Sequence, residues 1–396
     1  MASDSFSRKA GGEKGGRQVK IGIVTFFCVP NYGAMLQAYS LWKYLEERGH
    51  EVEFIDYAFG NARRIPFWKC FFSRNLHGYF DAIRKKLKAY VRFNIVHFSD
   101  VFPRTRRVAT FSELEDIGRN YDALIVGSDQ MWNPLWCSGK SLPVVMLDFA
   151  AKREKRIAYA VSFGTKEWKK ERKADEAGCL LREFDAISVR EESGMKLVQE
   201  LSGRDDAKCM VDPTLLHTAS FYEPLFNSEC RKQHRYVFSY MLEEWINDEN
   251  VEYFMRAVMA AKGIDEIHTD KVSVSGLLSP ICKLLDVQSK VSVGTWLSEI
   301  ANSDFVVTNS FHGTVFSILF HKPFLTIPIS GRMSGMNERV VSLLTMVGLG
   351  SRIVNIKDLD GFRDIMNTAI DWDEIDRRLD AERLRADAFL RDALQF

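Results

Sequence analysis

The chain has no cysteine pattern that indicates a disulfide framework or a metal site. Its seven cysteines are an odd number, are spread over 396 residues, and form no Cys-x-x-Cys motif. Disulfide scaffolds and zinc ribbons need close, paired spacing. We therefore expect neither a disulfide framework nor a bound metal, and this cysteine usage favours the reducing cytoplasm.

Long hydrophobic runs are also missing. No stretch reaches the ~18 consecutive apolar residues that a membrane-spanning helix needs, so no such helix is expected. Residues 1–18 are polar and rich in glycine. They lack the apolar core of a signal peptide, and we expect a disordered leader there.

The chain carries little net charge, +1 in total, which argues against nucleic-acid binding through overall electrostatics. Residues 61–110 differ, because they hold twelve Lys or Arg against two Asp, with aromatic residues interleaved. One interpretation is the solvated face of a helical insertion. A second is a surface that rests on an anionic membrane or on a phosphate-bearing acceptor. An RNA-binding patch is a third, although no recognised RNA-binding module accompanies it.

Several catalytic motifs are absent. The sequence contains no dinucleotide-binding GxGxxG, no Walker loop, no GxSxG and no HExxH, and no paired-carboxylate motif stands out. The chemistry that remains available comes from a histidine, arginines and helix N-termini. Such groups suit a small substrate with two anionic groups.

Apolar runs of strand length alternate with helical spacing along most of the chain. Val19 to Phe26 reads as a strand, a helical pattern follows it, and Val52 to Ile55 reads as the next strand. This β-α-β rhythm predicts parallel sheets. We expect an α/β fold of two Rossmann-like domains facing a central cleft. The expected divisions are 19–215, with the insertion at about 61–110, then 216–371, and a C-terminal helix at 372–396.

The stretch TNSFHGTVFSILFHKPF places a histidine between a predicted buried strand and a predicted buried helix. Ser310 can cap the helix, and the free N–H groups of the first turn then favour an anion. His312 would project into the same space, and Gly313 would let a ligand approach the backbone. The alternative is a hydrogen-bonded histidine buried at the domain junction.

A second candidate is Arg190, which directly follows an apolar strand in the stretch SVREES. Its guanidinium could grip a carboxylate or phosphate at two points. The alternative is a simple ion pair with Glu191 or Glu192.

The remaining candidates lie in loops. Gly127 and Ser128 offer donors at a strand end, and Trp132 with Asn133 resembles a sugar-stacking and hydrogen-bonding pair. Burial of Trp132 in the core is the alternative. Asn31 opens the first helix. In the stretch SGRMSGMNERVVSLL, Arg332 is either a mobile anion clamp or a surface arginine.

Taken together, these stretches resemble the polysaccharide pyruvyl transferase family. The matching pieces run in the family's order from Val19 to about Ile353, and the basic segment is the part that matches least. They include NYGAMLQAYS, VGSDQMWNP, ISVREESGMKLV, MVDPTLL and NSFHGTVFSILFHKPF. Many relatives have Arg-Leu where this chain has Ser310-Phe311, and an acidic residue where it has Ala34.

The resemblance implies a fold similar to the glycosyltransferase-B class. It also implies transfer of a pyruvyl group from phosphoenolpyruvate to two hydroxyls of a sugar, forming a cyclic ketal. Arg190 and His312 match the family's strand-end arginine and helix-start histidine. We expect phosphoenolpyruvate as donor substrate, no separate cofactor, and a glycan acceptor, either free or lipid-linked. Two alternatives are a glycosyltransferase with a nucleotide-sugar donor and a non-catalytic glycan-binding protein.

Overall fold

The computed structural model describes residues 17–59, 97–135, 137, 139–168, 173–230, 234–242, 249–273, 288–356 and 361–395. Nearly all of the expected leader, and residues 61–96 of the basic segment, lie outside these ranges, as do the predictions made for them.

The N-terminal half is built on a six-stranded sheet in the order β2-β1-β3-β4-β5-β6, in which all neighbouring strands are parallel. Its strands are β1 (Lys20–Val24), β2 (Glu51–Phe54), β3 (Ala123–Val126), β4 (Lys155–Val161), β5 (Ala186–Val189) and β6 (Lys208–Cys209). Its helices are α1 (Tyr32–Glu47), α4 (Phe111–Gly118), α5 (Leu142–Val145), α6 (Ala174–Leu181) and α7 (Glu192–Ser202). The central strand β3 is a wholly buried apolar run, as expected for a parallel sheet covered on both faces.

The C-terminal half holds a four-stranded parallel sheet in the order β12-β11-β7-β8. Its strands are β7 (Tyr236–Tyr240), β8 (Glu266–Thr269), β11 (Phe305–Thr308) and β12 (Phe324–Thr326), beside a small antiparallel pair of β9 (Lys271–Ser273) and β10 (Gln288–Lys290). Its helices are α9 (Glu249–Lys262), α11 (Val293–Asn302), α12 (Phe311–Leu319), α13 (Asn337–Met346) and α14 (Gly361–Asn367). The predicted α/β class with two parallel-sheet domains is confirmed.

Short helices connect the two halves. They are η5 (Pro213–Leu216), α8 (Ala219–Tyr222) and η6 (Glu223–Leu225). The expected domain division at 215/216 falls inside η5. Other single-turn 3₁₀ segments are η2 (His97–Val101), η3 (Gly139–Ser141), η9 (Gly331–Met336) and η10 (Gly350–Arg352).

Each sheet has a point where the strand order reverses. In the first sheet it lies between β1 and β3, and in the second between β7 and β11. Ligands of open α/β sheets bind in the crevice outside the carboxyl ends of strands at such a point. The loops that follow β1, β3 and β11 are therefore the natural place for a site.

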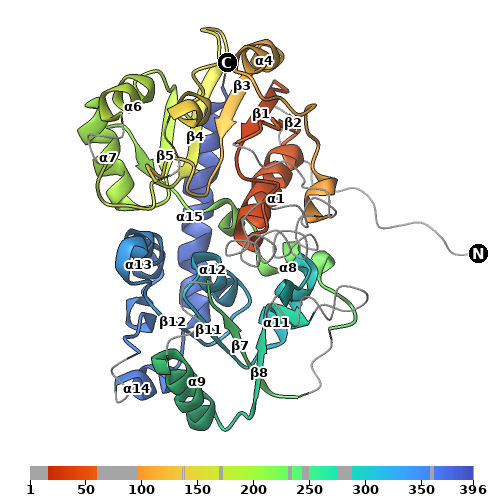
Figure 1. Ribbon diagram of the computed structural model, residues 1–396, viewed down its shortest axis with the longest axis vertical. Coiled ribbons are helices and arrows are strands. Elements are labelled where there is room, and N and C mark those ends of the chain that lie inside the picture. The colour runs from red at the N-terminus through yellow and green to blue at the C-terminus, as the bar shows by residue number, and fades with distance from the viewer. Residues whose placement is uncertain are drawn as a thin grey trace, which may run out of the picture.

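The two halves share one hydrophobic core, in which α1 packs against α11 and α12. The rings of Tyr32 and Trp296 are stacked with 5.0 Å between their centroids, and the Tyr32 hydroxyl donates to the backbone oxygen of Val291 at 3.0 Å. The long helix α15 (Trp372–Ala393) then runs from the lower half back to the upper one (Figure 1). There, Lys155 Nζ donates to the backbone oxygen of Ala393 at 3.1 Å. These contacts hold the loops of the two halves against each other.

Three arginines at the described end of the basic segment form ion pairs with Asp or Glu side chains. Arg104, Arg106 and Arg107 lie 3.4, 2.8 and 4.0 Å from carboxylate oxygens of Asp100, Glu113 and Asp56, respectively. These pairs fit the interpretation of a solvated surface at this end. Within the described residues, no helix combines the length and the apolar character that crossing a membrane requires.

Candidate active site

His312 lies in the first turn of α12, directly beyond β11. Ser310 caps that helix, because its Oγ accepts a hydrogen bond from the Gly313 N–H at 3.3 Å. A Cβ on Gly313 would approach Thr308 Oγ1 to 2.4 Å. The glycine is therefore required for packing of the helix on its own strand.

The imidazole of His312 lies against the first turn of α1 from the other half. A Cβ on Gly33 would come within 1.9 Å of His312 Nδ1. The ring is only 6% exposed. Its Nε2 has no hydrogen-bond partner among the described residues. His312 is therefore buried at the junction of the two halves, as the alternative interpretation expected, with one ring nitrogen left without a hydrogen bond.

We expect Gly33→Ala to lower the free energy of unfolding by about 1–3 kcal/mol, because the added methyl overpacks the ring of His312. Helix propensity alone favours alanine over glycine by up to about 1 kcal/mol, so a net loss would report the clash. Urea denaturation measures it. Gly350→Ala is the control, since nothing lies within 4 Å of its Cβ position. Equal stability of the two variants would contradict the contact.

Asp212 joins the two predicted residues into one cluster. Its Oδ2 accepts a hydrogen bond from Arg190 Nη1 and another from Ser128 Oγ at 2.8 Å, and it lies 3.6 Å from His312 Nε2. Its Oδ1 accepts from the N–H and the hydroxyl of Thr214 at 2.9 and 2.6 Å. This fully buried carboxylate is the partner of Arg190, in place of the neighbouring glutamates that the sequence offered.

The charges around Asp212 decide its ionisation. Burial alone would raise the pKa of Asp212, but the nearby charges of His312 and Arg190 outweigh burial and hold the pKa well below its usual value. Asp212 therefore stays a carboxylate at neutral pH.

Glu191 serves a separate loop. Its Oε1 accepts from Ser162 Oγ at 2.9 Å and from the N–H groups of Phe163 and Gly164 at 2.8 and 3.2 Å. These bonds use the carboxylate to order the loop after β4. Its Oε2 is buried without a hydrogen-bond partner, and Glu191 forms no ion pair with Arg190 among the described residues.

Part of the Arg190 guanidinium has no partner. Its Nε and Nη2 are buried without a hydrogen bond. Nη2 lies 3.9 Å from Asp129 Oδ1, and the guanidinium carbon lies 4.4 Å from the centre of the Phe311 ring. Buried charged donors normally have acceptors, so these atoms are candidates for an anionic ligand.

A cavity of about 740 Å³ opens onto this cluster between the two halves. Arg190, Asp212 and Phe311 line it, together with residues of α7, α13 and α15. In Figure 1, α7 and α13 lie on the same side of the molecule, one in each half. The volume is within the range of small-molecule sites.

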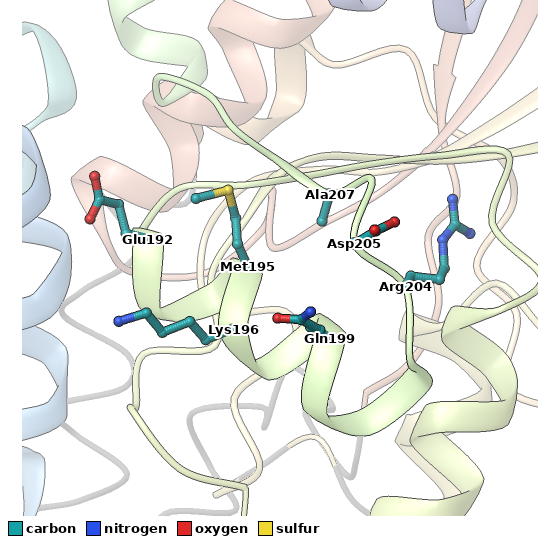
Figure 2. Close-up of a pocket in the computed structure, with 7 residues that line it drawn as sticks. All are labelled: Glu192, Met195, Lys196, Gln199, Arg204, Asp205 and Ala207. Atoms are coloured by element: carbon teal, nitrogen blue, oxygen red, sulfur yellow. The ribbon is translucent and has the colours of Figure 1, made fainter.

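A smaller cavity of about 270 Å³ lies beside α7 and shares Glu192, Met195, Lys196 and Ala207 with the larger one. Figure 2 shows Glu192, Met195, Lys196 and Gln199 along the helix, with Arg204 and Asp205 on the chain that follows it. Arg204 is held by Asp206 at 2.8 and 2.6 Å. Neither Arg190 nor Asp212 lines this cavity, so it carries no candidate chemistry.

The predicted acceptor pair lies in the core. Trp132 is 0% exposed and donates from Nε1 to the backbone oxygen of Val145 at 3.0 Å. Asn133, also 0% exposed, contacts the Gln130 amide at 2.6 Å and accepts from the Leu135 N–H at 2.9 Å. Their polar atoms are used within the protein, so the structure favours a structural role over sugar binding.

The other loop candidates are placed as follows. Gly127 packs where a Cβ would lie 3.0 Å from Thr25, and Ser128 is buried against Asp212. Asn31 is exposed and caps α1, accepting from the Ala34 N–H at 3.1 Å. Arg332 belongs to η9, but its side chain lies outside the described part of the chain.

Two residues of the cluster had no assigned role in the sequence. Asp212 follows β6 in the stretch MVDPTLL, and Arg339 lies in α13 in the stretch GMNERV. The Asp-Pro pair after a short strand is a helix-start signal, but that signal does not say what the carboxylate faces. Arg339 differs from an ordinary surface-helix arginine only by its 5% exposure.

Among the described residues, no group of three or more His, Cys, Asp or Glu is arranged to hold a metal ion. The cluster offers one carboxylate, one imidazole and two guanidiniums. That combination can bind an anion and move a proton.

Solved structures of low identity match almost the whole chain. UDP-GlcNAc 2-epimerase from Neisseria meningitidis bound to UDP-GlcNAc is 8% identical, with 94% of this chain and 99% of that chain covered and a TM-score of 0.46. The S. aureus MnaA structure with UDP is 10% identical over 93% and 91%, with a TM-score of 0.49. The spinosyn rhamnosyltransferase SpnG is 13% identical over 95% and 99%, with a TM-score of 0.44. All three TM-scores are below 0.5, so these matches do not indicate a function.

No curated protein matches the chain significantly. The family model does match. It is the model of polysaccharide pyruvyl transferases, and it covers residues 31–331 of the 396 in the chain. This range holds the strand-end arginine, the buried aspartate and the helix-start histidine of the cluster. The chain belongs to the polysaccharide pyruvyl transferase family.

Proposed function

We propose that this transferase moves a pyruvyl group from phosphoenolpyruvate to a sugar of a cell-surface polysaccharide, or of its lipid-linked precursor, and forms a cyclic ketal. The observation that carries the proposal is the state of the Arg190 side chain. Arg190 lines the cavity, and two of its buried donors have no partner. It lies in one cluster with Asp212 and His312. A guanidinium with spare donors is suited to the phosphate or carboxylate of this donor.

The reaction needs an acid. A proton added to the methylene carbon of phosphoenolpyruvate makes the neighbouring carbon cationic, and a sugar hydroxyl attacks that carbon. That hydroxyl gives its proton back to the imidazole, the bond between the carbon and the bridging phosphate oxygen breaks, and phosphate leaves. The second hydroxyl then closes the ring, and its proton goes to the released phosphate. His312 is the acid and base of the cluster, and its Nε2 has no other hydrogen-bond partner among the described residues.

Each residue of the cluster has a separate role in this reaction. Arg190 binds the anionic group of the donor, and Asp212 fixes Arg190 from the opposite side of the guanidinium. The aromatic ring of Phe311 stacks on the same guanidinium and limits its movement. Ser310 keeps the first turn of α12 in place, so that His312 stays beside Arg190.

The acceptor and the location are proposed on sequence grounds. We propose a glycan acceptor, a cytoplasmic enzyme, and contact of the basic segment with the anionic inner face of the membrane, where a lipid-linked acceptor would lie. The cavity between α7 and α13 is the route by which such an acceptor would reach the cluster.

The test is calorimetric titration of the protein with phosphoenolpyruvate, beside uridine and guanosine diphosphates. We expect phosphoenolpyruvate to bind and to raise stability by about 2.7 kcal/mol at a hundredfold excess over Kd. Arg190→Ala should abolish the binding. Arg256→Ala, an exposed arginine that pairs with Glu252 on α9, should not change it.

Binding of a nucleoside diphosphate alone would instead indicate a glycosyltransferase with a nucleotide-sugar donor. Binding of glycan without any donor would indicate a carbohydrate-binding protein. Either outcome would overturn the proposed function.

A further inference from the structure

Arg339 is a second buried arginine at the cluster, and it comes from the opposite half of the molecule. It lies on α13, is 5% exposed, and donates from Nε to the backbone oxygen of Met336 at 3.3 Å. The nearest aromatic contact is the Phe311 ring, whose centre lies 5.7 Å from its guanidinium carbon and 4.4 Å from that of Arg190. One ring therefore contacts both guanidiniums.

The charge of Arg339 has no direct counter-ion. Among the described residues, no carboxylate lies within ion-pair distance of it. Asp129, Glu191 and Asp212 are the carboxylates whose charges act on it, from beyond ion-pair distance. With its amide oxygen turned toward Arg339, the neutral side chain of Gln130 accepts from Nη1 and Nη2 at 3.2 and 3.0 Å.

Burial, followed by the like charge of Arg190, lowers the pKa of Arg339 to about 10. Two buried guanidiniums that contact the same ring repel each other, and an unpaired buried charge is costly. A protein that keeps such an arrangement gains from it when a ligand supplies the missing negative charge.

We propose that Arg339 is a second donor-binding residue, which acts with Arg190 from the other side of the site to hold two anionic groups of one ligand. The proposal rests on the proposed function for the identity of that ligand, because phosphoenolpyruvate carries both a phosphate and a carboxylate. Arg190 has its Nε and Nη2 unpaired, and each terminal nitrogen of Arg339 keeps one N–H beyond its bond to Gln130, so both can donate to an anionic group. One arginine comes from each half, so donor binding would also join the two halves.

The experiment compares Arg339→Met, Arg339→Lys and Arg256→Met with the unchanged protein. Binding of phosphoenolpyruvate, inorganic phosphate and uridine diphosphate is measured by calorimetry, and the unfolding temperature is measured without ligand. Arg256 is the control because its side chain is 76% exposed on α9, pairs with Glu252 and does not line the cavity.

We expect Arg339→Met to raise the Kd for phosphoenolpyruvate about 10- to 100-fold, as loss of a charge-assisted pair does. Arg339→Lys should raise it about tenfold, because lysine keeps the charge but not the fork. Arg256→Met should leave it within twofold. The unfolding temperature of Arg339→Met without ligand should equal or exceed that of the unchanged protein. If Arg339 served only to stabilise the fold, its removal would lower that temperature.

Loss of phosphoenolpyruvate binding in Arg190→Ala but not in the Arg339 variants would overturn this inference and leave the proposed function standing. Binding of phosphate or a nucleotide that depends on Arg339, without binding of phosphoenolpyruvate, would overturn the proposed function and leave Arg339 as an anion-binding residue. If Arg339→Met fails to fold, Arg339→Lys decides: an unchanged Kd in that variant overturns the inference.

Discussion

His312→Ala is expected to lower the rate of pyruvyl transfer about 10²–10⁴-fold, the range that general acid–base catalysis contributes. The methylene carbon of the donor is a weak base, and it lacks a proton source once the imidazole is gone. The measurement is kcat for release of phosphate from phosphoenolpyruvate in the presence of acceptor.

The same variant should still bind the donor. Arg190 keeps its bond to Asp212 when His312 is removed, so the Kd for phosphoenolpyruvate should change only a few-fold. His321→Asn is a matched control at the other end of α12, where His321 contacts Asp376 at 3.1 Å. Its backbone φ is 52°, a conformation that asparagine tolerates. A rate for His312→Ala within a few-fold of the unchanged protein would reject the acid–base role.

Asp212→Asn is expected to lower the free energy of unfolding at pH 7 by about 3–5 kcal/mol, the usual cost of removing one partner of a buried ion pair. The amide leaves Arg190 buried without its counter-ion and replaces an acceptor with a donor toward Ser128. Donor binding should be lost as well, because the guanidinium is no longer held in place. Urea denaturation and calorimetry measure the two effects.

The effect should depend on pH in one direction. Because the pKa of Asp212 is depressed in the folded protein, its stabilisation is fully present above the pKa of about 3.9 in the unfolded chain. The stabilisation is lost as pH falls from there through the folded-state pKa. The difference in unfolding free energy between the unchanged protein and Asp212→Asn should therefore be constant above about pH 5 and shrink below about pH 4.

Asp116→Asn is the control for that comparison, since Asp116 is 72% exposed and lies 3.8 Å from Arg119. Its effect should stay within about 0.5 kcal/mol, as for other surface pairs. If Asp212→Asn were equally harmless at pH 7, the carboxylate would not be what holds the cluster together.

The local pattern of the sequence was sufficient for Arg190 and His312. Each lies just after an apolar strand and at the start of a helix. In parallel sheets such loops meet at the carboxyl ends of the strands. The same argument placed Gly127 and Ser128 near the site, and Ser128 does bond to Asp212.

Trp132 and Asn133 also follow a strand, but they lie in the core. A loop residue can turn toward the ligand or back into its own domain, and the order of residues does not distinguish these two directions. Here the rings of Phe163 and Phe184 lie 5.3 and 5.5 Å from Trp132 and enclose it. Both rings come from later strands and loops, so the burial of Trp132 depends on partners that are distant in the chain.

Arg339 is another residue whose burial could not be predicted from the sequence. Its helix is amphipathic, and an arginine there is usually solvated. Its guanidinium faces Gln130 of the other half. The loop after β4 approaches the preceding segment, where the backbone oxygen of Gly164 lies 3.0 Å from the Cβ position of Gly335.

The chain's own pattern thus specifies the alternation of strands and helices, the two parallel sheets, and the residue types available at the strand ends, because these follow from hydrophobic spacing and capping. Only the tertiary structure decides that Asp212 pairs with Arg190, that Gly33 makes room for His312, and that Arg339 lacks a counter-ion. Each of these contacts joins segments far apart in the sequence. Their distances depend on how α1, α12 and α13 pack in the shared core, and no local pattern encodes that.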